Sequence, residues 1–123
     1  KSRMSKAKAV IVVSTFSTEE SAAEIGKKLV EKGLCACVNF TKIRSIYSWK
    51  GRVEDQPEYI AFFKVAKGSA KALKEELARV HPYDVPEIVE IKMSDVSKPY
   101  LSWLVDAESA HRVAKKRDHP SKR

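Results

Sequence analysis

The alternation of hydrophobic and polar residues along the chain predicts a mixed α+β fold. A short β-branched run at residues 9–14 predicts a central strand that is covered on at least one face. Apolar residues at helical spacing follow it and predict a helix. We expect this helix to begin at a Ser17 cap, with Glu20 completing a capping box, and to end at Gly33.

Residues 35–65 predict a long β-hairpin that turns at Gly51. Each arm is about 13 residues, or about 43 Å, whereas a common strand has about 5–6 residues. Two ordinary helices cannot cover such a ribbon, and an isolated hairpin is marginally stable in water. Something must therefore cover the outer half, which carries Tyr47 and Trp49. A second copy of the chain is the simplest candidate, so we expect an oligomer in which the ribbons pack together.

The remaining segments predict a helix, a strand and a last helix. The second helix opens at Gly68 and ends before Pro82, a strand covers 86–93, and the last helix starts at Ser97. After Ala110 the chain is charged and polar, and we expect frayed helix or disorder. The resulting order is a ferredoxin-like βαββαβ pattern with an extended hairpin and an extra C-terminal helix.

Charge is concentrated at the two ends of the chain. Of the net charge of +8, residues 1–8 carry +4, residues 111–123 carry +5 and the middle is close to neutral at −1. We expect a basic N-terminal extension at 1–7, one folded domain at 8–109 and a basic tail at 110–123. Basic ends are more often solvated tails than binding surfaces, so a nucleic-acid partner is not expected.

The sequence also bears on the cellular compartment. No apolar run reaches the 18 residues of a membrane helix, and the basic start lacks the layout of a secretory signal. We therefore expect no membrane partner and a cytoplasmic protein. Cys35 and Cys37 fit a reducing compartment, because cysteines two apart on one strand are poorly placed to bridge each other.

Cys35 and Cys37 are also candidate metal ligands. If both lie on a strand, their sulfur atoms point to the same face, and two soft donors could start a Cu(I) or Zn site. The alternative is packing in the core, since free cysteine is among the most buried residue types. We favour the core, because no further cysteine or histidine lies close to them in sequence.

The loop at 81–87 is stiffened by Pro82 and Pro86 and presents His81, Tyr83, Asp84 and Glu87. An imidazole beside carboxylates can bind a divalent metal or move a proton. The alternative is that His81 only satisfies backbone carbonyls where the helix ends. The two interpretations are equally supported by the residues.

The hairpin adds Tyr47, Trp49, Glu58 and Lys64 as candidate residues of a polar cleft between subunits. Glu58 and Lys64 share a strand face, although a surface ion pair of little energetic value is the alternative. Aromatic residues at 59–63 lack the glycines and basic start of an RNA-binding strand. The sequence also has no catalytic or phosphate-binding motif, so we expect a non-catalytic protein.

Several strings together resemble the CutA family of divalent-cation tolerance proteins over about residues 8–108. They are Cys35-Ala36-Cys37-Val38-Asn39, Ser45-Ile46-Tyr47-Ser48-Trp49-Lys50-Gly51-Arg52-Val53, Glu58, Lys64, His81-Pro82-Tyr83-Asp84-Val85-Pro86-Glu87 and Tyr100-Leu101-Ser102-Trp103. The resemblance implies a ferredoxin-like homotrimer with interlocked ribbons. It also implies a response to metal ions, and some members of that family bind copper.

The resemblance directs attention to one ligand set. The copper ligands of a bacterial member fall on Ser14, Val80 and His81, of which only His81 is a metal ligand in this chain. The candidate metal residues are therefore His81, Cys37 and Cys35, with copper or another divalent cation as ligand and no obligatory cofactor. The alternative function is a trimeric signalling module that binds a small anionic ligand in the same cleft, with Lys64 as the counter-charge.

Overall fold

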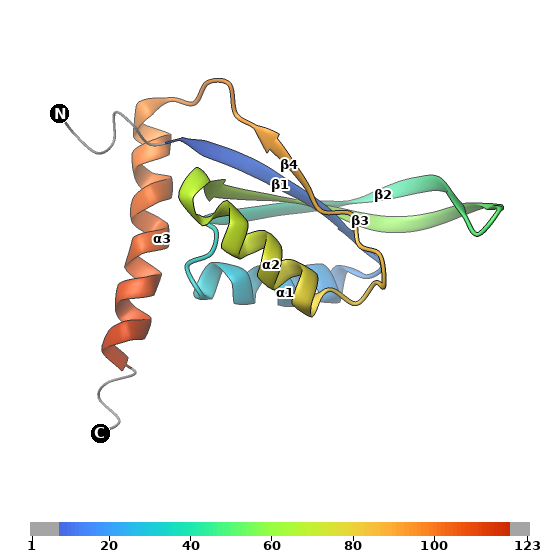
Figure 1. The fold of residues 1–123 in the computed structure, drawn as a ribbon, viewed down its shortest axis with the longest axis horizontal. Helices are drawn as coiled ribbons and strands as arrows, with labels where there is room; N and C mark the ends of the chain where they lie inside the picture. Colours follow the sequence, from blue (N-terminus) through green and yellow to red (C-terminus); the bar gives the residue numbers. More distant parts are fainter. Residues whose placement is uncertain (1–7, 119–123) are drawn as a thin grey trace.

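The computed structural model describes residues 8–118, and side chains for residues 8–112. Over residues 8–118 the chain forms four strands in one antiparallel sheet, in the order β2-β3-β1-β4, and three α-helices (Figure 1). The elements are β1 (Ala9–Phe16), α1 (Glu19–Glu31), β2 (Cys37–Trp49), β3 (Arg52–Ala66), the 3₁₀ turn η2 (Lys67–Ser69), α2 (Ala70–Val80), β4 (Val89–Lys92) and α3 (Lys98–Asp118). The element order is the one that the sequence predicted.

The main core lies between the sheet and the two helices α1 and α2 (Figure 1). Alternate residues of β1 and β3 face these helices, among them the fully buried Phe16 and Phe63. Leu29 of α1 and Leu73 and Leu77 of α2 complete the layer. Burying each of these large side chains contributes about 1.5–3 kcal/mol, so this one layer fixes the positions of both helices and of β1.

The β2–β3 hairpin turns at Gly51, as the sequence predicted, and the structure shows a two-residue turn because Trp49 pairs with Arg52. Lys50 and Gly51 both have positive φ, at 50° and 76°, which is the geometry that matches the twist of a hairpin. β3 pairs with β1 only from Tyr59 onward, so its first part pairs with β2 alone. The ribbon therefore extends beyond the rest of the sheet (Figure 1) and leaves Ile46 64% and Val53 77% exposed.

Two local predictions differ from the structure. Thr18, not Ser17, caps α1, because its side chain accepts a hydrogen bond from the Ser21 amide at 3.0 Å. β4 has only four residues, fewer than the predicted 86–93. Its Glu90 bonds to lysines on the helix side of the sheet, so by alternation the apolar residues of β4 lie on the other face and are about half exposed.

α3 packs across the end of the sheet that lies away from the ribbon (Figure 1). Buried Glu108 accepts hydrogen bonds from the Ala66 amide and the Ser69 hydroxyl, both at 2.8 Å. Arg112 donates to the carbonyl of Gly33 at 2.7 Å. These bonds hold the second half of the helix, which continues past Ala110 to Asp118 although its sequence there is polar.

Candidate functional site

An open cleft of about 940 Å³ lies where the ribbon, the end of β1 and the loop after α2 meet. The cleft brings together five of the six residues that the sequence assigned to it. These are Tyr47, Trp49, Glu58, Tyr83 and Glu87. They come from β2, β3 and the 81–87 loop, so the antiparallel hairpin and the end of α2 position them within one chain.

His81 lies behind this cleft rather than in it, and only 8% of the residue is exposed. Its ring stacks on Phe16, with 4.6 Å between the ring centroids. Its Nε2 lies 2.9 Å from the carbonyl oxygen of Thr15 and 3.1 Å from the hydroxyl of Ser14. Its Nδ1 accepts a hydrogen bond from the Tyr83 amide at 3.1 Å.

These partners define the chemical state of the imidazole. Nδ1 accepts a hydrogen bond, so the proton of the neutral ring is on Nε2, which donates to Thr15. Burial lowers the pKa of His81, although the bond to Thr15 and the charge of Glu58 oppose this. Both ring nitrogens are thus engaged, and His81 holds the 81–87 loop against β1.

Tyr83 connects this buried group to the cleft. Its hydroxyl donates a hydrogen bond to Oε2 of Glu58 at 2.7 Å, and Glu58 is only 9% exposed. Burial, and then the bond to Glu58, raise the pKa of Tyr83, so it stays protonated and remains a donor at neutral pH. The floor of the cleft is therefore an ordered tyrosine–carboxylate pair.

The charge of the cleft is negative. Glu58, Asp84 and Glu87 line it, and Arg44 is the single basic residue that the described part of the chain contributes. Arg44 is already engaged by Asp55 on the neighbouring strand, through bonds of 2.8 and 2.6 Å. A cleft of this composition attracts cations more strongly than anions.

Lys64 is the predicted cleft residue that the structure places elsewhere. It lies opposite Cys37 in the β2–β3 register and donates to Asn39 at 2.6 Å. It lies six positions along β3 from Glu58, or about 20 Å away. The alternative hypothesis, a small anionic ligand in this cleft, used Lys64 as the counter-charge. Within one chain, Lys64 does not reach the cleft.

The two cysteines do not share a strand face, contrary to the geometry on which the thiol pair rested. β2 begins at Cys37, so Cys35 precedes the strand. Cys35 is fully buried in the main core, whereas Cys37 packs in the smaller cluster beneath α3. Burial, and then the charge of Glu108, raise the pKa of Cys35 to about 12, so its thiol is protonated and a poor metal ligand.

The proposed copper residues are therefore not brought together in one chain. His81 lies at the C-terminal end of β1, and the cysteines lie beside the rung where Ile11 pairs with Lys64. In the part of the chain that the structure describes, no three histidine, cysteine or acidic residues are grouped so that they could hold a metal ion. The donor set of a single chain does not fit a copper ion.

Several cleft residues were missed by the sequence interpretation. The missed residues include Thr15, Ser17, Arg44, Ser45, Gln56 and Pro57. Those on the hairpin could have been found by counting back from the turn, because Trp49 pairs with Arg52 and the register then follows. Nothing in the sequence places the end of β1 beside the ribbon.

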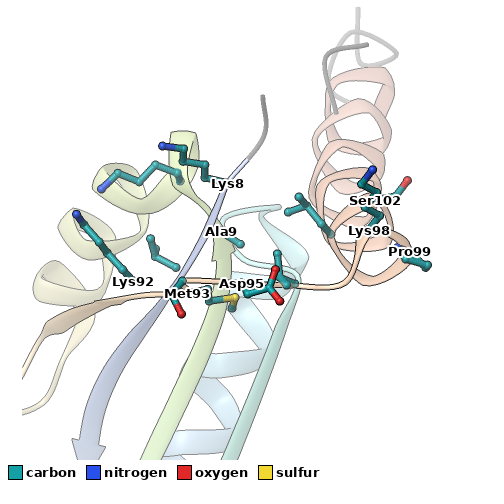
Figure 2. Close-up of a pocket in the computed structure, with 13 residues that line it drawn as sticks. Lys8, Ala9, Lys92, Met93, Asp95, Lys98, Pro99 and Ser102 are labelled. Atoms are coloured by element: carbon teal, nitrogen blue, oxygen red, sulfur yellow. The ribbon is translucent and has the colours of Figure 1, made fainter. Parts of the chain in front are cut away.

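A second and larger cavity, of about 1160 Å³, lies at the opposite end of β1 (Figure 2). Among the residues that the structure describes, four lysines line it and Asp95 is the single acidic residue. The sequence interpretation did not anticipate this cavity. Among the described residues, no helix combines the length and the apolar character needed to cross a membrane.

Comparison with known proteins points to one family, both by sequence and by structure. The family profile described as "CutA1 divalent ion tolerance protein" matches residues 10–107. The divalent-cation tolerance protein CutA of Thermotoga maritima is 46% identical over 95 residues, which cover 77% of this chain and 94% of that protein.

Solved structures agree with that match. A crystal structure of CutA1 from Pyrococcus horikoshii superposes with a TM-score of 0.78 at 38% identity, covering 80% of this chain and 96% of the other. The periplasmic divalent cation tolerance protein CutA from Archaeoglobus fulgidus gives a TM-score of 0.79 at 29% identity, covering 81% and 98%.

Proposed function

The chain belongs to the CutA1 divalent ion tolerance family, and from this membership we propose that it is a non-catalytic metal-response protein. We propose further that it binds a divalent cation at the acidic cleft and that a neighbouring copy of the chain completes the site. The observation that supports this most directly is that Glu58, Asp84 and Glu87 line one open cleft whose one described basic residue, Arg44, is already paired. Within one chain these carboxylates do not form a metal-binding group, which is why the proposal needs the neighbouring copy.

The donors in the cleft indicate the class of cation. Carboxylate oxygens favour hard divalent ions such as Mn²⁺ over Cu(I), which prefers sulfur. Copper at the predicted residues would require His81 to give up a buried hydrogen bond, or Cys35 to lose a proton inside the core. The proposal therefore rests on the cleft, with His81 as the residue that positions its loop.

The proposal requires a homotrimer with a ferredoxin-like subunit, as the family resemblance implies. Apolar and aromatic side chains on the ribbon support it, since Ile46, Tyr47, Trp49 and Val53 are all at least 41% exposed in the single chain. Tyr47 and Trp49 also line the cleft, so a neighbour that covers the ribbon would reach the carboxylates. The cytoplasmic location remains a proposal, based on the two free cysteines.

Calorimetric titration of the reduced protein with Mn²⁺, Zn²⁺ and Cu²⁺ tests the site, and sedimentation velocity tests the trimer. We expect saturable binding that is at least tenfold weaker in the variant Asp84→Asn/Glu87→Gln. Both side chains are exposed, so the variant should fold normally. The matched control, Glu24→Gln/Glu75→Gln, removes two exposed carboxylates from α1 and α2 and should bind like the parent protein.

Four results would count against the proposal. Absence of saturable binding would remove the metal role, and equal losses in both variants would mean that only overall charge matters. Binding that persists in Asp84→Asn/Glu87→Gln but disappears in Cys35→Ala/Cys37→Ala would move the site to the thiols. A monomer in sedimentation would remove the shared site.

A further inference from the structure

The second cavity is built around lysines that are far apart in the sequence. Lys8 precedes β1, Lys67 follows β3, Lys92 ends β4 and Lys98 begins α3, and all four line the same cavity. Figure 2 shows Lys8 and Lys92 on one side and Lys98 on α3 on the other, with Asp95 between them.

The sheet register explains why three of these lysines are neighbours. The Lys67 amide donates to the Lys8 carbonyl at 2.8 Å, just beyond the pair formed by Ala9 and Ala66. Lys92 pairs with Val10, which places it diagonally across from Lys8 on the same face of the sheet. Like charges held this close are unfavourable unless an opposite charge compensates them.

The carboxylates nearby supply only part of that compensation. Glu90 accepts from both Lys67 and Lys74 at 2.6 Å, so its charge is already shared between two cations. Those two bonds lower the pKa of Glu90 to about 2. Within residues 8–112, Lys8, Lys92 and Lys98 form no ion pair, which leaves an excess of positive charge around the cavity.

The remaining lining is largely apolar. Ala9, Val10, Met93, Val96 and Leu101 contribute to the wall. A cavity of about 1160 Å³ is much larger than an inorganic anion requires and is in the range of small-molecule sites. Apolar wall and basic rim together match a ligand that has an apolar body and an anionic group.

We propose that this lysine-lined cavity binds a small organic phosphate, that is, a phosphate ester with an apolar or aromatic moiety. The phosphate would lie against Lys8 and Lys92 on the α2 side of the sheet, and the apolar moiety would pass the start of β1 to reach Met93 and Leu101 on the α3 side. A soluble ligand is favoured over a flat anionic surface, because the lysines surround a concavity rather than a plane. The proposal is independent of the metal cleft, which lies at the other end of β1.

Calorimetry with 1-naphthyl phosphate tests the proposal, with inorganic phosphate and neutral 1-naphthol as comparison ligands. We expect saturable binding of the ester, at least tenfold weaker binding of the other two, and weaker binding at high salt. Lys8→Gln/Lys92→Gln should lower the affinity at least tenfold. Asp95→Asn, which removes the single lining carboxylate, should tighten binding.

The matched control is Lys27→Gln/Lys28→Gln, which removes two exposed lysines of α1 and should change the affinity less than twofold. The proposal is overturned if the cavity variant binds like the parent or if the control loses as much. It is also overturned if 1-naphthol binds as tightly as the ester, or if vesicles containing phosphatidylserine bind while the ester does not.

Discussion

The two cavities lie at opposite ends of one strand and differ in almost every physical respect. Thr15, near the end of β1, lines the acidic cleft, and Ala9, at its start, lines the basic cavity. Ala9 and Thr15 are six positions apart on β1, so about 20 Å separates them. The acidic cleft rests on buried, hydrogen-bonded groups, whereas the basic cavity is formed by exposed lysines.

The two cavities are stabilised in different ways. Hydrogen bonds link Tyr83 to both His81 and Glu58. A substitution at any of the three therefore affects both the stability of the fold and the shape of the cleft. Lys92 and Lys98 are held only by the backbone beneath them, so they can be changed without cost to the fold. The largest stability effects are therefore expected at the acidic end.

The largest effect should come from His81→Ala. It removes the ring that stacks on Phe16 and leaves the Thr15 carbonyl and the Tyr83 amide without their partner. We expect a loss of about 2–4 kcal/mol in the free energy of unfolding, measured with urea. Lys92→Gln at the basic end should change it by no more than about 0.5 kcal/mol. Similar losses in both variants would show that the two ends do not differ in this way.

A smaller effect is expected from Tyr83→Phe. The change removes only the hydroxyl that donates to nearly buried Glu58, and a hydrogen bond to a charged group contributes about 1.5–3 kcal/mol. Some water can replace the donor, so we expect a loss of about 1–2 kcal/mol in chemical denaturation. Tyr47→Phe is the control in the same cleft, because Tyr47 is 41% exposed and should lose almost nothing. Equal losses would mean that the bond to Glu58 contributes no special stability.

The smallest effect should appear in the pH dependence of stability. The folded-state pKa of His81 lies below its usual value of 6.5, so the unfolded chain binds the proton more readily and stability falls as the pH drops below about 6.5. Glu90 behaves differently, because its folded-state pKa of about 2 lies below the unfolded value of 4.5. Its contribution is present above pH 4.5 and is lost as the pH falls toward 2.

The Glu90→Gln variant separates the two pH windows. Thermal unfolding followed from pH 7.5 to 2.5 should give a shallower loss below pH 4.5 than in the parent. The slope below pH 6.5 should stay, because His81 is unchanged. A variant curve parallel to that of the parent below pH 4.5 would contradict the role of Glu90.

Much of the fold could be predicted because local chemistry determines it. Gly51 specifies the hairpin turn, and the alternating apolar residues of β3 specify which face meets the helices. The cap of α1 was predicted wrongly because two neighbouring residues can fill that role. Thr18 and Ser17 can both cap a helix, and only the path of the chain from Phe16 decides which hydroxyl reaches the Ser21 amide.

The sites were less predictable because they depend on long-range register. Tyr47 and Glu58 line the same cleft because the hairpin pairs β2 with β3. The position of the one turn at Gly51 was enough to predict that both lie on this hairpin. Lys64 was assigned to the same cleft by face alone, without regard to its distance along β3. Lys8, Lys67 and Lys92 become neighbours only when β1 pairs with both β3 and β4, which the sequence does not specify.

The free outer half of the ribbon has a consequence for amide hydrogen exchange. Residues 52–58 pair only with β2, so the hairpin can unzip from Gly51 inward without disturbing β1. In a dilute single chain, protection should fall steadily from Tyr59 toward the turn. If a second copy covers the ribbon, opening requires dissociation, and the exchange rates of these amides become dependent on protein concentration.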